Sequence, residues 1–473
     1  MLKRLLSIFV LLVCIKTSFA QSSSQSPYSY YGVGELQYQG SASQLGMAGL
    51  SYSYRDSFNI NINNPASFSA LKLTVFDLAI RLGHSAYKTS SQKSDVNNGT
   101  FSYINIGFPI ISKKWGTSVG LIPFSATGYN LKTVGFTTSN VVYTNTYTGT
   151  GGINRVYWGN GFALGRNLSV GVNASYFFGT VTKGRNTEFS RSGYYNSSSY
   201  VATHYNNMGF NFGVLFKTDS LFNIKQNYFQ RYVITDSVTA SGDTLKVTKD
   251  LFAGLTRMQR KNMKAYKWLR FNFGLTGNLA NEVEITSDTY NHTYKYNNAN
   301  VPIQRDTILL ANNQVIKTKF PLFIAGGISL QDVNHWLVGI DGNYQQWSDF
   351  STANNDSLNN SFKIAMGGEY TPKYNSPTYW QRVNYRAGAR FTRTQINLKN
   401  TPINDIAFTF GFGIPIRKDA VTAASGVYQT RLNLGFEIGR LGTTQNSLLK
   451  ENYFRLTIGL NFTENWFVKR KYD

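Results

Sequence analysis

The chain has 473 residues, of which 42% are hydrophobic, 15% aromatic and only 15% charged, and its formal net charge is +23 at pH 7. A single cysteine, Cys14, excludes a disulfide framework and a cysteine-based metal site. Beyond the start of the chain, no apolar run reaches the roughly 20 residues of a membrane-spanning helix, so a helical membrane protein is excluded.

The start of the chain has the features of a secretory signal peptide. Lys3 and Arg4 precede an almost unbroken apolar run to Ile15, and Ala20 completes a small-x-small cleavage site. The run is about eleven residues long, too short for a spanning helix of roughly 20 residues. We predict a signal peptide over residues 1–20 and export of the remaining chain.

The next fifty residues show no long alternation of polar and apolar positions. They are rich in Ser and Tyr at first and then carry Gly, Asn and Pro. Such a segment is long enough to enter the lumen of a large barrel, and large barrels are often plugged. We predict a plug over residues 21–70 and a barrel over residues 71–473.

Strict alternation of polar and large apolar residues is the main signal of the remaining chain. It is clear in Arg270–Asn278, Arg431–Ile438 and Phe454–Phe462. A soluble β-sandwich would also alternate, but its strands mostly have nearer 5–6 residues. Many of these runs are longer, as tilted membrane strands of about 9–11 residues require. The sequence therefore favours an all-β fold, a transmembrane antiparallel β-barrel.

The runs give about fourteen strands, and the even strand numbers of bacterial barrels leave twelve, fourteen or sixteen. They centre on Phe76, Ile104, Val119, Tyr157, Val172, Phe210, Phe273, Phe323, Val338, Ile364, Ala387, Phe408, Leu434 and Ile458.

The alternation also predicts which side chains face lipid. We expect a charge at Phe271, Leu434 or Ile458 to destabilise the barrel by about 2–4 kcal/mol if these residues lie at mid-bilayer depth. On the same reasoning, we expect a charge at Asn272 or Asn433 on the lumen face to be tolerated.

Several connections are rich in Asn, Ser, Thr and Tyr and are expected to be mobile outer loops. These are Ser90–Gly99, Lys183–Tyr200, Thr289–Val301 and Asn354–Ser361.

The connection Asp219–Lys267 is longer and basic, and Leu251–Met263 within it is compatible with a short helix. It is either a basic surface patch for anionic lipid or a partner, or a solvated extension of two long strands. In an exported chain the basic charge favours outer-membrane lipid and lipopolysaccharide as surroundings over nucleic acid.

Motifs for catalysis are missing from the sequence. The histidines His84, His204, His292 and His335 are scattered, without the spacing of a metal site. The chain has no nucleophile-elbow motif, no Walker-type phosphate loop and no EF-hand spacing. We therefore predict neither enzymatic activity nor a cofactor.

The segment after the signal peptide resembles the hatch of the long-chain fatty-acid transporter (FadL) family. Gly46-Met47-Ala48-Gly49 is followed by Asp56 and then by Asn64-Pro65-Ala66, similar to the family's "GMGGA … D … NPA" pattern. The resemblance makes Gly46, Gly49, Asn64, Pro65 and Ala66 the plug motif, structural or gating. Glycine permits tight turns, and proline rigidifies one.

Three later stretches resemble the same family in the same order, especially its Bacteroidetes-type members. These are Pro321 to Trp347-Ser348-Asp349-Phe350, Tyr385-Arg386-Ala387-Gly388 to Gly411-Phe412-Gly413-Ile414-Pro415, and Trp466-Phe467-Val468-Lys469-Arg470-Lys471.

The resemblance implies a 14-stranded outer-membrane barrel with an N-terminal hatch, in which hydrophobic solutes leave through the wall where a strand kinks. The first hypothesis is passage of small hydrophobic or amphipathic molecules across the outer membrane. The second is a non-transporting accessory subunit of an outer-membrane complex, as in PorV-like barrels of type IX secretion or in barrel-assembly machinery, with protein partners. A hatch disfavours a third alternative, an open porin.

Overall fold

The computed structural model describes residues 26–464, except 192, 227–231, 239–243, 251–264, 334, 352–357, 375, 377 and 417–429. The predicted signal peptide and the Leu251–Met263 helix lie outside the described residues. Among the described residues, no helix is long and apolar enough to cross a membrane.

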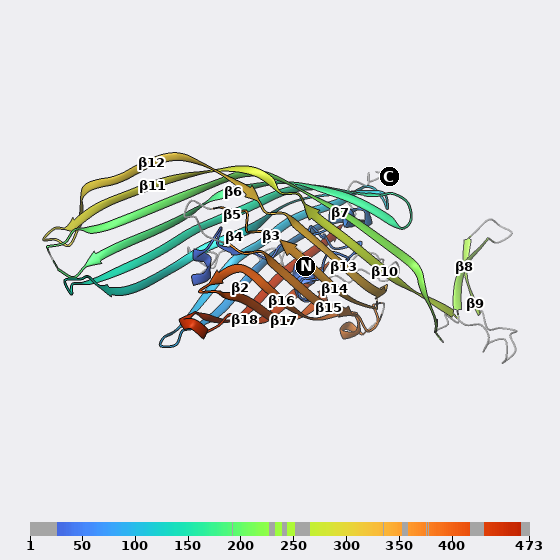
Figure 1. Ribbon diagram of the computed structural model, residues 1–473. Helices are drawn as coiled ribbons and strands as arrows, with labels where there is room; N and C mark the ends of the chain where they lie inside the picture. Colours follow the sequence, from blue (N-terminus) through green and yellow to red (C-terminus); the bar gives the residue numbers. More distant parts are fainter. Residues whose placement is uncertain are drawn as a thin grey trace.

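Fourteen antiparallel strands form a closed barrel (Figure 1), as predicted, and each contains one of the predicted strand centres. The ring closes where β19 pairs with β2 over its whole length, from Lys450↔Lys88 to Glu464↔Thr74. The strands are β2 (Thr74–Lys88), β3 (Lys93–Ile111), β4 (Trp115–Phe136), β5 (Val142–Ala163), β6 (Leu168–Phe189), β7 (Asn196–Gln226), β10 (Ala265–Asn278), β13 (Phe323–Asp332), β14 (Trp336–Gln345), β15 (Ser361–Tyr370), β16 (Asn384–Leu398), β17 (Thr401–Pro415), β18 (Arg431–Gly442) and β19 (Lys450–Glu464).

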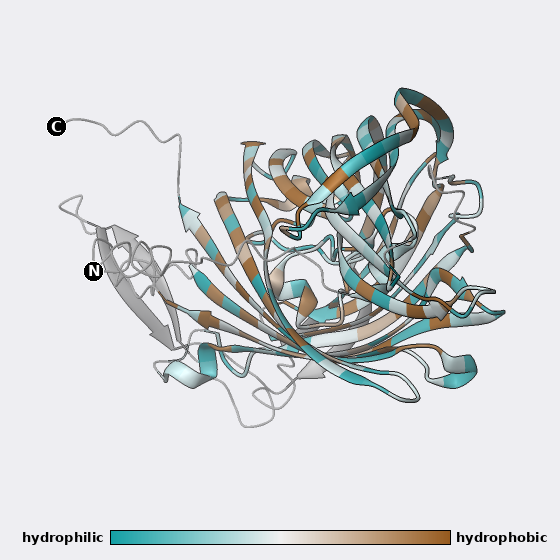
Figure 2. Ribbon diagram, turned by 90° about the vertical axis from the view of Figure 1, so that its left-hand side faces the viewer, coloured by the Kyte–Doolittle hydropathy of each residue, from teal (hydrophilic) through white to brown (hydrophobic). Residues whose placement is uncertain are grey.

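The strands place apolar side chains outside and polar side chains inside, as the alternation predicted. In β10, Phe273 and Leu275 are 43% and 46% exposed, whereas Asn272 and Thr276 are 0% and 3% exposed. In Figure 2 the strands carry alternating brown and teal bands, which correspond to hydrophobic and hydrophilic residues. An outer apolar surface and an inner polar surface are what a bilayer and a lumen require.

The inner positions are packed rather than open to water, which corrects one expectation. Asn272 donates to Ser329 Oγ (3.2 Å), and Asn433, 2% exposed, accepts from Arg386 Nη1 (2.8 Å). A charge at Asn272, or a positive charge at Asn433 beside Arg386, would therefore be buried without an opposite charge, and we now expect it to destabilise the protein.

Two further strands extend the wall beyond the ring. β11 (Asn281–Tyr296) pairs with β12 (Pro302–Phe320) and with the first part of β7. They form a long sheet with β4 to β7 (Figure 1). Residues 90–99, 183–200 and 289–301 were largely wrong as loops, because all three stretches are mostly strand, and residues 354–357 of the fourth predicted loop lie outside the described residues. Their polar composition without alternation is typical of loops, yet Thr and Tyr suit strands.

Part of the basic connection 219–267 is also strand. β7 and β10 continue into it, and β8 (Tyr232–Val238) pairs with β9 (Thr244–Asp250) as a separate two-stranded sheet.

The N-terminal segment, residues 26–73, lies against the inner faces of the strands. It contains η1 (Pro27–Tyr30), β1 (Glu35–Leu36), α2 (Ala42–Leu45) and η2 (Pro65–Ala70). Gly116 and Gly274 show how close the backbones come, because a Cβ there would lie 2.0 Å from the Phe68 carbonyl oxygen and 1.8 Å from that of Tyr52. The wall glycines thus provide room for the segment.

Candidate functional site

A cavity of about 340 Å³ lies between the N-terminal segment and the barrel wall. The segment contributes Tyr28, residues 34–39, Tyr52, Ile62 and Asn63, and the rest of the lining comes mainly from side chains of the strands. One part of this lining is charged and another is aromatic, so the cavity is amphipathic.

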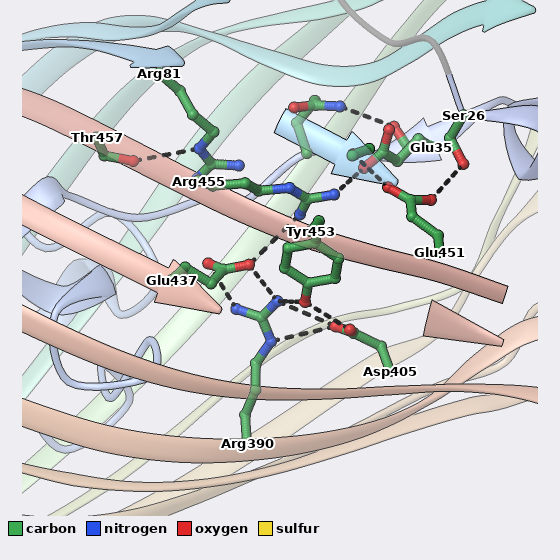
Figure 3. Close-up of polar contacts among 12 residues, drawn as sticks. Ser26, Glu35, Arg81, Arg390, Asp405, Glu437, Glu451, Tyr453, Arg455 and Thr457 are labelled. Carbon is green, nitrogen blue, oxygen red and sulfur yellow. Dashed lines mark hydrogen bonds and ion pairs between the residues drawn. The ribbon is translucent and has the colours of Figure 1, made fainter. Parts of the chain in front are cut away.

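Arg390 on β16 is the centre of the charged part (Figure 3). Its Nη2 lies 2.8 Å from Glu437 Oε1 on β18 and 3.0 Å from Asp405 Oδ2 on β17. It also donates to the Tyr453 hydroxyl (3.1 Å), which donates to Asp405 Oδ1 (2.6 Å). Glu437 is only 1% exposed, so this network is well shielded from water.

Arg455 on β19 links the network to the N-terminal segment. Its Nη2 lies 2.8 Å from Glu35 Oε1 of β1, and its Nη1 lies 3.5 Å from Glu437 Oε1. A second link is Ser26, whose hydroxyl donates to Glu451 Oε2 (2.9 Å) (Figure 3). The N-terminal segment is therefore held to β19 by charge-assisted contacts.

Three other cations line the cavity, and among the described residues none has a carboxylate in ion-pair contact. Arg81 Nε donates to Thr457 Oγ1 (3.3 Å), and Arg155 Nε donates to Ser175 Oγ (2.9 Å). Lys363 Nζ lies 6.0 Å from the centre of the Tyr52 ring. These cations give the cavity a positive potential that suits an anionic group.

The aromatic part is formed by Phe124, Phe177 and Phe320. Their ring centres are 5.0 Å apart for Phe124–Phe177 and for Phe177–Phe320, and 6.3 Å apart for Phe124–Phe320. This surface suits the apolar part of a ligand.

Two tyrosines of the N-terminal segment also line the cavity. Burial raises the pKa of Tyr38 and of Tyr52 well above the usual value, so both phenols stay neutral. The Tyr52 hydroxyl accepts from Asn343 Nδ2 (2.7 Å). Among the described residues, no group of three or more His, Cys, Asp or Glu side chains could hold a metal ion.

A second, polar cavity of about 390 Å³ lies at Tyr54–Asn59 of the N-terminal segment. It shares no lining residue with the first cavity. The stretch between Tyr52 and Asn63 therefore borders both cavities.

The residues of the predicted plug motif lie in two places and do not form one site. Gly46 packs against the wall, where a Cβ would lie 3.1 Å from Gly411 Cα. Gly49 has a φ of +86°, which favours glycine.

Asn64, Pro65 and Ala66 lie elsewhere, at the start of η2. Asn64 Oδ1 accepts from the Ala66 amide (3.2 Å), and its Nδ2 donates to the carbonyls of Tyr52 (2.7 Å) and Val214 (3.1 Å). Pro65 occupies the first turn of η2. In the structure, these contacts cap η2 and join the N-terminal segment to β7.

Sequence reasoning missed the charged network. Arg390, Asp405, Glu437 and Arg455 come from four strands, and each looks like an ordinary lumen residue. Their charges lie on strand faces that point into the barrel, and this is the sequence signal that could have indicated the network.

These features define a fourteen-stranded barrel of the outer-membrane type with an amphipathic cavity beside an internal N-terminal segment. The chain belongs to the BamG family, whose model matches residues 1–264 and 250–473. No curated protein matches the chain.

Solved structures with a similar fold include a Pseudomonas aeruginosa FadL homologue, with a TM-score of 0.53 and 10% identity over 92% of this chain and 100% of that one. The Ralstonia pickettii toluene transporter TbuX has a TM-score of 0.51 and 11% identity over 90% and 99% of the two chains. The CymD monoaromatic hydrocarbon channel has a TM-score of 0.50 and 10% identity over 92% and 99%. The FadL resemblance is confirmed at the level of the fold, and the closer PorV relation stays a prediction.

Proposed function

We propose that this protein resides in the outer membrane, after removal of its signal peptide, and passes small hydrophobic or amphipathic molecules across it. The observation that carries the proposal is the cavity, with cations on one part and the Phe124–Phe177–Phe320 cluster on another. The similar folds of TbuX and CymD, a toluene transporter and a hydrocarbon channel by title, support it. The proposed surroundings are outer-membrane lipid and lipopolysaccharide, and no catalytic role is proposed.

In this function the N-terminal segment acts as a plug. The apolar tail of a transported ligand packs on the phenylalanine cluster, while its anionic head binds Arg155 or Lys363. Passage toward the second cavity requires movement of the stretch between Tyr52 and Asn63. The hydrogen bonds from Asn461 Nδ2 to the Phe58 carbonyl (3.1 Å) and from Asn173 Nδ2 to the Ile62 carbonyl (2.9 Å) oppose that movement.

Binding to the purified full chain tests this proposal. The probes are a fluorescent fatty acid and the neutral alcohol of the same chain length. We expect Arg155→Leu with Lys363→Leu to weaken fatty-acid binding by roughly 10-fold or more, because a hydrogen bond to a charged group contributes about 1.5–3 kcal/mol. Alcohol binding should change little. Lys132→Leu is the control because Lys132 is exposed and does not line the cavity. Absence of any binding by the unchanged protein contradicts the proposal.

A second candidate function is that of an accessory subunit in an outer-membrane complex. It is favoured by membership of the BamG family and by the wall extension and the β8–β9 sheet, which reach beyond the ring. Purification from native membranes in mild detergent tests it. Stable co-purification of the same partners supports a complex, and purification of the barrel alone contradicts it.

A further inference from the structure

The long sheet that β4 to β7 form with β11 and β12 has two faces with different surroundings (Figure 1). Odd-numbered residues of β5 and β6 face the N-terminal segment, because the Tyr147 ring centre and Lys183 Nζ lie 6.3 Å and 5.2 Å from the Tyr30 ring centre. The ladders that join β5, β6, β7 and β11 have no register shift, and successive side chains of a strand alternate between its faces. Even-numbered residues of these four strands therefore point away from the N-terminal segment, and we call this side the outer face.

The outer face has an apolar part and a polar part along the same strands. On β7, Met208, Phe210 and Phe212 are 62%, 53% and 52% exposed. Beyond them, the even-numbered residues 196–206 are Asn, Ser, Tyr, Ala, His and Asn. On β6, the even-numbered residues 180–188 are Thr, Thr, Gly, Asn and Glu, and on β5 the even-numbered residues 144–150 are all Thr. The apolar part suits lipid, and the polar part lies outside it.

The connections between the strands indicate on which side of the membrane the polar part lies. At the apolar end, β3–β4 and β5–β6 are joined by the short turns 112–114 and 164–167. At the other end, the hairpins β4–β5 and β6–β7 continue into the polar part. Bacterial barrels have short periplasmic turns and longer extracellular loops. The polar part is therefore expected on the extracellular side.

Cross-strand pairs bring aromatic rings and short polar side chains together in the polar part. Tyr200 pairs with Tyr290, and Ser198 pairs with His292. The rings of Tyr290 and His292 are stacked, with centres 4.7 Å apart and an interplanar angle of 26°. On the other side, Ser198 pairs with Asn186 and donates to its Oδ1 (2.7 Å). We call the following residues the outer patch: Thr148, Asn186, Ser198, Tyr200, Tyr290 and His292.

Several polar groups of the outer patch are available to a ligand. Tyr200 is 46% exposed. Among the described residues, none forms a hydrogen bond with the hydroxyls of Tyr200 and Tyr290 or with Nδ2 of Asn186. Hydroxyls both donate and accept, and an amide nitrogen donates. The outer patch therefore combines flat aromatic surface with donors and acceptors.

The outer face is free of positive side chains in its polar part, although the chain as a whole has a net charge of +23. The even-numbered residues in 144–154, 180–188, 196–206 and 282–296, all of them described, include no Lys and no Arg. The charged residues among them are acidic: Glu188, Glu282, Glu284 and Asp288. Phosphate and carboxylate ligands are bound by Arg and Lys. The outer patch therefore suits an uncharged ligand.

A sugar ring has the chemistry that fits the outer patch. One side of the ring presents C–H groups, which pack on aromatic faces, and its rim carries hydroxyls that donate and accept hydrogen bonds. The outer patch has rings for the first and Thr, Ser and Asn side chains for the second. It contains no aliphatic side chain of the kind that fills the core of a protein interface, so a sugar fits it better than a protein partner.

An aromatic girdle is the other explanation for exposed tyrosines on a membrane barrel. Girdle residues lie at the boundary of the lipid. Tyr200 lies eight residues beyond Met208, the last exposed apolar residue of the apolar part on β7, which is roughly 26 Å along a strand. The outer patch is thus outside the girdle. A lipopolysaccharide whose acyl chains lie against Met208 and Phe210 has its sugars on this side, next to the same strands.

We propose that the outer patch binds uncharged sugars of lipopolysaccharide, whose acyl chains lie against the apolar part of the same strands. This inference rests on the outer-membrane location in the proposed function and adds a glycan-binding surface that does not use the cavity. In this site, Tyr200 and Tyr290 pack on a sugar ring, and Asn186 Nδ2 donates to one of its hydroxyls.

Binding of two forms of lipopolysaccharide to the purified full chain tests the inference. The probes are lipopolysaccharide with its complete sugar chain and a truncated form that keeps lipid A and the innermost sugars. The test variant is Tyr200→Ala with Tyr290→Ala. The control is Tyr344→Ala with Tyr370→Ala, two tyrosines of β14 and β15 that are 42% and 48% exposed and lie outside the outer patch. Heat-modified gel mobility verifies that both variants are folded.

We expect the unchanged chain to bind the complete form more tightly than the truncated form. The test variant should bind the complete form roughly 5-fold more weakly or worse, and the control should bind it as the unchanged chain does. Equal affinity of the unchanged chain for both forms overturns the proposal, and so does an unchanged affinity of the test variant. If polysaccharide freed from lipid A binds as tightly as the complete form, lipopolysaccharide is not the occupant.

Two further results separate this proposal from others. If the test variant keeps its affinity for the complete form but loses a protein that co-purifies with the unchanged chain, the outer patch is a protein interface and the proposal is overturned. Fractionation of cell membranes tests the location on which the inference rests. Absence of the chain from the outer-membrane fraction contradicts the proposed function, and this result is independent of what the purified chain binds.

Discussion

Truncation of Glu437 is the sharpest test of the charged network. Glu437 is 1% exposed, and its carboxylate contacts Arg390 Nη2 at 2.8 Å and Arg455 Nη1 at 3.5 Å. Glu437→Ala leaves both guanidinium groups in place without this carboxylate. Removal of one partner from a buried ion pair typically costs about 3–5 kcal/mol. Arg390 keeps Asp405, and Arg455 keeps Glu35, so we expect the lower end, about 3 kcal/mol.

Urea unfolding of the full chain in lipid vesicles measures this free energy, with heat-modified gel mobility as the readout of the folded barrel. Glu282→Ala is the control, because Glu282 is exposed on β11. Arg390→Leu combined with Glu437→Leu should cost less than the sum of the single changes, because no guanidinium then faces a missing carboxylate. A loss below about 1 kcal/mol for Glu437→Ala would refute the reasoning, since that is the value of a surface pair.

Three further changes test the packing of the N-terminal segment and the lipid face. Gly274→Ala should destabilise the barrel by about 1–3 kcal/mol, because its Cβ would lie 1.8 Å from the Tyr52 carbonyl oxygen. Gly193→Ala is the control, because a Cβ there meets no atom within 4 Å, and thermal unfolding compares the two variants. Asn64→Ala should cost about 1 kcal/mol through loss of the cap on η2, with faster proteolysis of the segment as the measurement. Phe273→Lys should cost about 2–4 kcal/mol at mid-bilayer depth in the vesicle assay, and a neutral effect contradicts the lipid-facing assignment.

The ring of strands was predictable because lipid outside and a packed lumen inside impose a two-residue period on each strand. Phe273 and Leu275 show this period in the sequence and again in their exposure. The wall extension was not predictable in this way. Residues 289–296 of β11 carry mostly polar and tyrosine side chains without a polar–apolar alternation, and strands of this kind resemble loops in composition.

The candidate site could be predicted only in part, because some of its residues come together only through strand register. The plug motif follows from local chain chemistry, such as the cap of Asn64 and the positive φ of Gly49. The network of Arg390 and Glu437 depends on register, because both residues meet only when β16, β17 and β18 pair at one level. A period of two identifies the face of each residue but not its level along the barrel.

Strand pairing also indicates which side of the cavity is held more firmly. The charged part of the cavity lies among β16 to β19, whose ladders are long and joined by buried ion pairs. On the opposite side of the cavity, the ladder of β7 with β10 ends at Phe212↔Gly277, and the ladder of β7 with β11 begins only at His204↔Thr286. Segments with fewer ladder hydrogen bonds open at lower free energy than those with many. The side of the cavity at β7 should therefore open at lower free energy than the side formed by β16 to β19.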